Sequence, residues 1–307
     1  MFLYVTAQVS PRCGDMRDVA AILEGSLYRE KANKTLGDLP PFSPILNRLL
    51  ADLGRDDVSF SKLSDLIEKD TVIAGNILRV VNSALYGRRG TINSVRSAVS
   101  VLGLNKLRNF VLGMSVSRMW TQTALPKSFS TSRFNQHNVA VAILADLLAQ
   151  HLPVHYPEGA FIAGLFHDLG KMLIAVGIRP EAEEIEKLYA QGTKRLIECE
   201  ESVLGLNHAD LSGVAVIAWN LPEPVQTAVL NHHRPAFAAP KETIPLSRVI
   251  AAADLYINNH GRSIDPQIAV IDLEGPDTLE SLGLGDKSAE VLKQFEAEFE
   301  SISAFFH

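Results

Sequence analysis

Apolar residues recur at helical spacing along almost the whole chain, and this period decides the fold class. In one clear case, Ile73, Ile77 and Val81 fall on one face of a helix that Asp70 would cap. No segment has the alternating pattern, flanked by hairpin signals, that predicts β-strands. The sequence therefore predicts an all-α fold.

Composition and charge indicate a globular protein of the cytoplasm. Hydrophobic residues make up 47% of the chain and charged residues 21%, values typical of globular domains. No apolar run reads as a bilayer span, and the first residues lack the basic leader and cleavage site of a secretory signal. The two cysteines, Cys13 and Cys199, are far apart, which argues against disulfides or a thiolate metal site. The net charge of −6 makes nucleic acid an unlikely partner, although Arg88-Arg89 leaves a local basic patch open.

Proline, glycine and hydroxyl residues divide the helical pattern into four segments. The loop 121–132, with Pro126, separates two larger helical units. The predicted segments are an N-terminal helical extension over 1–36, a series of short helices over 37–125, a helical bundle over 126–275 and a C-terminal helix over 276–307. The last helix is amphipathic, so we expect it to serve packing or oligomerisation.

Helix ends in the first unit have recognisable signals. We expect Ser59 and Asp70 to cap helices, and Gly54, Gly87 and Gly103 to end them.

Two helices that meet at Gly103 also allow a DNA-binding helix-turn-helix. Its second helix offers polar residues for contacts with bases or phosphates, namely Asn105, Lys106, Arg108 and Asn109. Apolar residues such as Leu107 and Phe110 occupy much of the same surface, so a buried scaffold helix is the favoured interpretation.

The pair His167-Asp168 ends the apolar run 160–166 and points to a metal site. Imidazole nitrogen and carboxylate oxygen suit iron, manganese, zinc or nickel, as one ion or two. Asp254 also follows apolar and small residues, where burial without a partner is costly. A lone histidine on an apolar helix is more often a satisfied core or surface residue, so the interpretation depends on several such residues meeting.

Several ordered motifs extend this interpretation. They are Leu39-Pro40-Pro41-Phe42, Ile67-Glu68-Lys69-Asp70, Ile77-Leu78-Arg79-Val80-Val81-Asn82-Ser83-Ala84-Leu85-Tyr86 and Ala98-Val99-Ser100-Val101-Leu102-Gly103. Together they resemble the HDOD domain family, from about Leu39 to about Pro235. The resemblance implies an all-helical bacterial signalling or regulatory module whose second unit is an HD-like bundle.

The resemblance also implies a set of metal ligands in the order used by the wider HD superfamily. The set is His137, His167, Asp168, His208, His232, His233 and Asp254. Asp210 is an alternative to His208, and His232 and His233 can face one point only at a helix end. We expect His151, His155, His260 and His307 to lie at the surface.

Catalytic candidates are Asp168 and Lys171, because Gly170-Lys171 follows the His-Asp pair as in active relatives. Lys171 would hold phosphate, and its alternative role is a solvent-facing charge. Two departures weaken the case for catalysis. Arg133 stands where some relatives with several metals have an acidic residue, and Arg234-Pro235-Ala236 replaces the glycine-tyrosine-proline signature of cyclic-dinucleotide phosphodiesterases.

The leading functional hypothesis is a regulatory protein that binds a signalling protein or a nucleotide and carries a metal-binding HD site. The alternative is a metal-dependent phosphohydrolase that acts on a nucleotide or another phosphoester. A DNA-binding regulator comes third. Asn82 and Ser83 are expected to bracket neighbouring helix ends rather than to bind a ligand.

Overall fold

The computed structural model describes residues 16–51, 60–86, 91–235, 243–265, 272, 274–275 and 278–306. These residues form helices and their connections, with no β-strand among them and one isolated bridge between Val154 and Ile244. The all-α prediction is confirmed. The predictions for Cys13, Gly54, Ser59, Gly87, Arg88-Arg89 and His307 fall outside the described residues.

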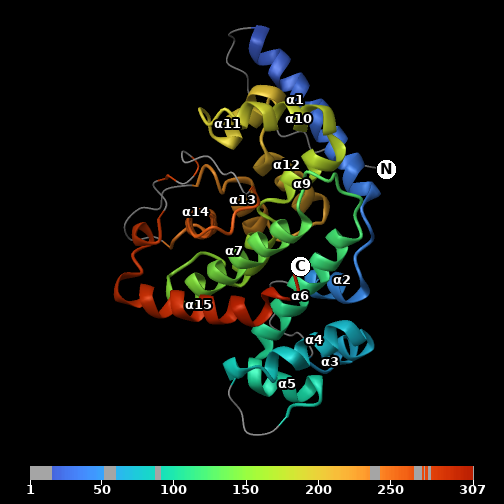
Figure 1. Ribbon diagram of the computed structural model, residues 1–307, viewed down its shortest axis with the longest axis vertical. Helices are drawn as coiled ribbons and strands as arrows, with labels where there is room; N and C mark the ends of the chain where they lie inside the picture. The colour runs from blue at the N-terminus through green and yellow to red at the C-terminus, as the bar shows by residue number, and fades with distance from the viewer. Residues whose placement is uncertain are drawn as a thin grey trace.

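In the described residues of the first part of the chain there are six α-helices, arranged as in Figure 1. They are α1 (Met16–Asp38), α2 (Pro44–Ala51), α3 (Phe60–Lys69), α4 (Thr71–Val81), α5 (Val95–Leu102) and α6 (Leu104–Thr121). Asp70 caps α4 by accepting hydrogen bonds from the amides of Val72 and Ile73, both at 3.1 Å. Gly103 ends α5 with a φ of 77°, which a residue with a Cβ rarely adopts. Helices α3 to α5 lie at the lower end of the molecule, and α6 leads from them to its centre.

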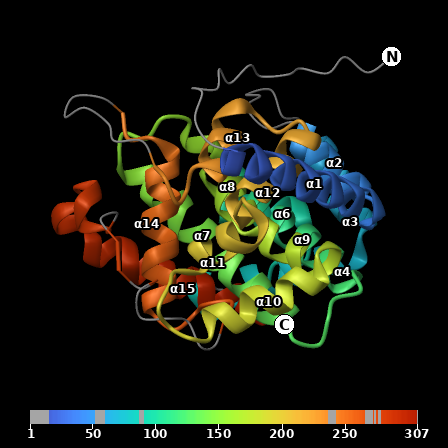
Figure 2. The same ribbon diagram turned by 90° about the horizontal axis from the view of Figure 1, so that it is seen from above.

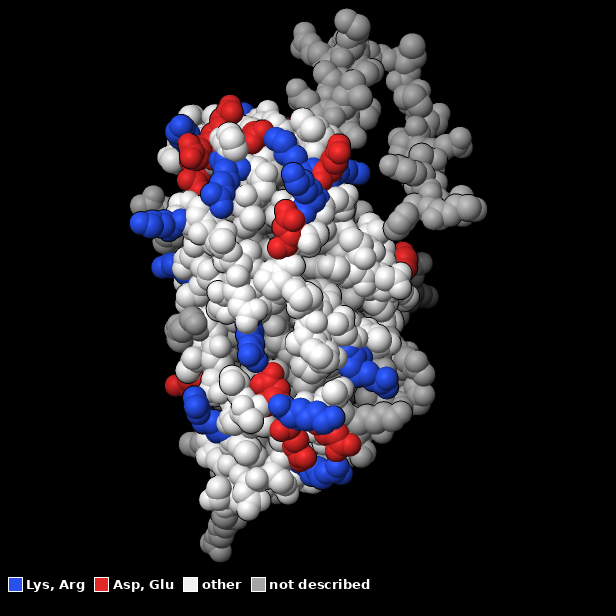
Figure 3. All heavy atoms as spheres, turned by 90° about the vertical axis from the view of Figure 1, so that its right-hand side faces the viewer, with Lys and Arg blue, Asp and Glu red and all other residues white. Residues whose placement is uncertain are grey.

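Helix α6 is a buried scaffold helix, as expected. Leu107 and Phe110 are buried, and so is Asn109, one of the residues considered for DNA contact. Lys106 forms an ion pair with Glu298 near the C-terminus. On the face drawn in Figure 3, acidic and basic side chains of the described residues are mixed, without a continuous basic stripe.

Asn82 acts as the predicted polar bracket. Its Nδ2 donates to the carbonyl oxygens of Leu78 at 2.7 Å and Ile92 at 2.8 Å, and its Oδ1 accepts from the amide of Ile92 at 2.8 Å. Asn82 therefore joins the end of α4 to the segment that precedes α5. The Oγ of Ser83 is buried without a hydrogen-bond partner among the described residues.

The second part of the chain is a bundle around one long central helix (Figures 1 and 2). Its α-helices are α7 (Thr131–His151), α8 (Ala160–Phe166), α9 (Leu169–Gly177), α10 (Arg179–Tyr189), α11 (Leu196–Leu204), α12 (His208–Ala218), α13 (Glu223–Leu230), α14 (Leu246–Asn259) and α15 (Ser288–Ser303). Short 3₁₀ turns cover Ala84–Tyr86, Pro157–Gly159, Glu280–Leu282 and Gly285–Lys287. Helix α7 is buried along most of its length and packs against α8, α14 and α15.

The central helix and α8 touch through small residues. A Cβ built on Gly164 would lie 2.7 Å from the Cα of Ala142, which is closer than real contacts allow. Gly164 and Ala142 therefore let the two backbones come together, and this contact brings the end of α8 next to α7.

One apolar stretch, Pro157–Gly177, is long and apolar enough to cross a membrane by length and composition alone, contrary to the prediction that no apolar run would span a bilayer. In the structure 83% of an 18-residue segment within this stretch is buried inside the protein. The helical stretch is also broken between α8 and α9, at His167 and Asp168. Such burial is typical of the core helices of a globular protein.

Helix α15 uses its apolar face within the chain. Val291, Phe295 and Ile302 are buried, and α15 packs on α7. The ring of Phe306 approaches Gly113 of α6, with 3.4 Å between the ring and a Cβ built at that glycine. Packing therefore accounts for this helix, and oligomerisation through it stays a prediction.

Candidate metal centre

The break between α8 and α9 places His167 and Asp168 at the centre of the bundle. Helix α8 ends at Phe166, and Asp168 leaves helical geometry with φ −99° and ψ 11° before α9 begins. Both side chains are fully buried. A histidine and an aspartate buried at a helix break need polar partners, and the surrounding helices supply them.

His137, His167, Asp168 and Asp254 form the first group around this point. One ligand atom from each lies within 4.8 Å of all the others. The Nε2 of His137 is 3.1 Å from Asp254 Oδ1 and 3.4 Å from Asp168 Oδ2. The Nε2 of His167 is 3.4 Å from Asp168 Oδ2 and 3.6 Å from Asp254 Oδ1. Two imidazoles and two carboxylates therefore converge.

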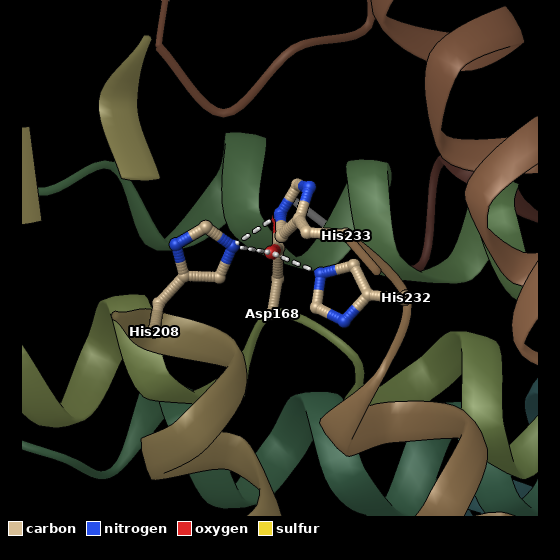
Figure 4. Close-up of side chains that lie close together, drawn as sticks. All are labelled: Asp168, His208, His232 and His233. Carbon is tan, nitrogen blue, oxygen red and sulfur yellow. Dashed lines mark hydrogen bonds and ion pairs between the residues drawn. The ribbon is translucent and has the colours of Figure 1, made fainter. Parts of the chain in front are cut away.

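Asp168, His208, His232 and His233 form the second group (Figure 4). His208 is the first residue of α12, and His232 and His233 lie in the turn after α13. The Nε2 of His208 is 3.2 Å from Asp168 Oδ1 and 2.8 Å from the Nε2 of His233, while the Nε2 of His232 is 3.8 Å from Asp168 Oδ1. The three imidazoles surround one carboxylate oxygen. Because the helix has already ended, both adjacent histidines reach the same point.

Asp168 belongs to both groups. Its Oδ2 faces His137 and His167, and its Oδ1 faces His208 and His232. A carboxylate placed in this way suits two neighbouring divalent ions, each completed by nitrogen and oxygen ligands.

The outer nitrogens of the histidines are held by the protein. The Nδ1 of His137 donates to the carbonyl oxygen of Arg262 at 2.9 Å, that of His167 to Gly164 at 2.7 Å and that of His232 to Val229 at 2.7 Å. The Nδ1 of His208 is 2.7 Å from Glu200 Oε2, which also accepts from the His208 amide at 2.8 Å. These partners fix the tautomer, so that Nε2 presents its lone pair to the centre.

A cation fits these donors. Pairs of Nε2 atoms face each other at 3.3 Å between His137 and His167 and at 2.8 Å between His208 and His233, so a proton or a metal ion has to separate their lone pairs. Asp168 Oδ1 and His232 Nε2 are buried without a hydrogen-bond partner among the described residues. A cation bound between them would satisfy both atoms.

The pKa values agree with a centre that attracts positive charge. Burial alone would lower the pKa of His137, but its hydrogen bonds to Asp168 and Asp254 raise that pKa to about 9. Burial would likewise lower the pKa of His208, and Glu200 and Asp168 raise it to about 9. Burial lowers the pKa of His232 to about 3, with His167 and His208 acting in the same direction. His232 is therefore neutral, which is the state that binds a metal.

A cavity of about 860 Å³ lies over the centre. Lys171 lines this cavity and places its Nζ 2.6 Å from Asp168 Oδ2. Arg133, one turn before His137 on α7, also lines the cavity and donates from Nη1 to the carbonyl oxygen of Ser263 at 3.3 Å. The volume is within the range of small-molecule sites.

All the ligands proposed from the sequence meet at the centre. Asp210, the alternative to His208, and the histidines expected at the surface, His151, His155 and His260, do not belong to either group. The carboxylate of Asp210 accepts from the amide of Asn207 at 3.0 Å and serves as a helix cap. His155 and His260 are exposed, and His151 bonds to the carbonyl oxygen of Leu147 at 2.9 Å.

Sequence reasoning missed Glu200, which is 2% exposed and supports His208. No signal in the sequence pointed to it, because the burial of Glu200 depends on the helices that pack around α11.

The fold and the site define the class: this is an all-α helical bundle with a buried His/Asp cluster that could hold metal ions. The family follows from similarity to known proteins. The family model of the HDOD domain matches residues 39–235. The chain belongs to the HDOD domain family, which confirms the resemblance seen in its motifs.

Solved structures of similar fold cover nearly the whole chain. An HDOD domain protein of unknown function from Geobacter sulfurreducens has a TM-score of 0.70 at 22% identity and covers 90% of this chain and 98% of its own. A candidate phosphohydrolase from Shewanella amazonensis SB2B has a TM-score of 0.68 at 21% identity, with the same coverage of 90% and 98%. At these identities the likeness shows the fold alone.

One relative among curated proteins is an uncharacterised protein from Treponema pallidum (strain Nichols). It is 23% identical over 222 residues, which are 72% of this chain. The match covers 42% of the relative's length.

Proposed function

We propose that this protein binds two divalent transition-metal ions and hydrolyses a phosphoester in the cavity above them. The observation that carries this proposal is the position of Asp168, whose two oxygens are shared between two complete groups of His/Asp ligands. Seven converging ligands, four of them histidines whose Nδ1 atoms are held by hydrogen bonds, are more than a structural role for these helices requires. The candidate phosphohydrolase from Shewanella amazonensis SB2B has the same fold and supports the proposal by analogy.

His137, His167 and Asp254 would hold one ion, and His208, His232 and His233 would hold the other, with Asp168 available to both. Ions bound there would lower the pKa of water and polarise a phosphoryl oxygen. Lys171 lines the cavity next to Asp168, where its ammonium group can bind a phosphoryl oxygen and orient the ester. Burial alone would lower the pKa of Lys171, but Asp168 raises it, so the side chain stays charged.

A regulatory role, the leading hypothesis from the sequence, is the second candidate. One observation favours it. The side chains of Val72 and Leu85 are 56% and 41% exposed in the first part of the chain, apart from the metal centre. An exposed apolar side chain gains free energy when a partner protein covers it. If this candidate is correct, Val72→Ser with Leu85→Ser abolishes capture of the partner in a pull-down, and Asp168→Ala leaves it intact.

The test of hydrolysis combines metal analysis with an activity panel. The purified protein is analysed for Fe, Mn, Zn and Ni and then assayed with phosphomonoesters and phosphodiesters in the presence of each metal. We expect metal-dependent hydrolysis that His167→Ala and Asp168→Ala both abolish. His155→Ala is the matched control, because His155 is exposed and lies away from the centre. Absence of bound metal, or activity that survives both substitutions, would contradict the proposal.

A further inference from the structure

The cavity wall combines charged and aliphatic side chains. Next to the centre it is charged, with the ligands themselves and Lys171. Four helices contribute aliphatic side chains to the wall, with Ile174 from α9, Ile185 from α10, Leu196 from α11 and Leu255 from α14. A phosphate at the metals would therefore leave its organic group against an apolar wall.

Apart from the proposed ligands, Lys171 and Glu200, the charge on the wall is mainly negative among the described residues. Five carboxylates line the cavity there, namely Glu183, Glu186, Asp265, Asp272 and Glu274. The cations in the same set of described residues are Arg133, Lys187 and Arg195. Arg195 donates from Nη2 to the carbonyl oxygen of Glu274 at 3.2 Å, so part of its guanidinium group is engaged with the wall itself. The cavity away from the ligands and Lys171 is thus a poor place for a second anionic group.

We propose that the site takes an ester with a single phosphate group and an uncharged, apolar or aromatic organic group. This inference rests on the proposed function and names its substrate class. The phosphate binds at the positive end, formed by the metals and Lys171, and the organic group covers the aliphatic side chains of the four helices. A further phosphate or carboxylate would lie among carboxylates, and this repulsion selects against polyphosphates.

Binding of phosphonates tests the proposal without relying on turnover. Isothermal titration calorimetry on the full chain loaded with Mn²⁺ compares phenylphosphonate, methylphosphonate and 4-carboxyphenylphosphonate, which differ only in apolar area or in one added charge. We expect phenylphosphonate to bind at least about tenfold more tightly than methylphosphonate, because the ring buries apolar surface. We expect the added carboxylate to weaken binding several-fold, and salt to reduce this loss.

Two variants test whether the aliphatic side chains of the cavity cause the preference for phenylphosphonate. Leu196→Ser should remove most of the preference for the phenyl group, because Leu196 lines the cavity. Leu188→Ser is the matched control, since Leu188 is also a partly buried leucine packed on the core but does not line the cavity. Metal content of both variants should equal that of the unchanged protein.

The outcomes separate this inference from the proposed function. Equal affinity for phenylphosphonate and methylphosphonate, or tighter binding of the carboxylated compound, overturns the inference alone. Failure of the metal-loaded protein to bind any phosphonate or inorganic phosphate overturns the proposed function and the inference with it.

Discussion

The backbone at Gly170 lies against His208 so closely that a Cβ at position 170 would come within 1.9 Å of the His208 carbonyl oxygen. The amide of Gly170 also donates to the hydroxyl of Ser212 at 2.7 Å. This contact joins the start of α9, which follows Asp168, to the start of α12, which begins with His208. Gly170 therefore sets the distance between two proposed metal ligands.

Replacing this glycine is expected to damage the second metal group. Gly170→Ala forces α12 away from α9, so we expect loss of the ion held by His208 and a fall in stability of about 1–3 kcal/mol. Metal content and thermal unfolding measure the two effects. Gly75→Ala is the control, because Gly75 lies in α4 with nothing within 4 Å of its added Cβ, and alanine there should stabilise the fold slightly. Full metal content in Gly170→Ala would contradict the argument.

Substitution of the two aspartates should give different metal stoichiometries. Asp168→Asn weakens both groups, because both use this carboxylate, and we expect little bound metal. Asp254→Asn affects only the group with His137 and His167, and we expect one ion per chain. Elemental analysis after dialysis reads the stoichiometry directly. The same loss in both variants would mean that the groups do not act as two sites.

Glu200 is expected to matter although it does not touch the proposed ions. Glu200→Gln weakens the hydrogen bond that orients His208, and supporting residues of this kind typically change metal affinity by about 10- to 100-fold. Competition with a fluorescent chelator measures the affinity. Glu184→Gln, an exposed position on α10, is the control and should leave affinity unchanged.

Asp146 should make stability depend on pH away from the metal centre. Burial raises its pKa from 3.8 to about 6, Asn109 acts in the opposite direction, and Glu298 adds to the increase. The folded chain therefore holds a proton that the unfolded chain has lost, and stability falls as the pH rises from about 4 to 6. The Asp146→Asn variant lacks this titrating group. Its free energy of unfolding, relative to that of the unchanged protein, should therefore rise over the same pH interval. Thermal unfolding at several pH values measures the difference, and a constant difference would refute the assignment.

Local signals in the sequence predicted much of this structure. Asp70 and Gly103 mark helix ends through capping and backbone geometry, which depend on neighbouring residues only. The proposed ligands were found because their order matches a known pattern.

Glu200 and Gly170 were missed for a physical reason. Their roles depend on which helices lie side by side, and helical periodicity does not specify this. The buried Pro157–Gly177 stretch shows the same limit, because its composition alone does not distinguish a core from a membrane.

The proposed ligands come from α7, the α8–α9 break, α12, the turn after α13 and α14. The unfolded chain does not bring these segments together, so any ion bound here favours the folded state, by about 2.7 kcal/mol per site when free metal exceeds the dissociation constant a hundredfold. Resistance to proteolysis should therefore rise with metal supply. In a cell short of the preferred metal, the protein would be degraded sooner, so that its lifetime follows the metal concentration.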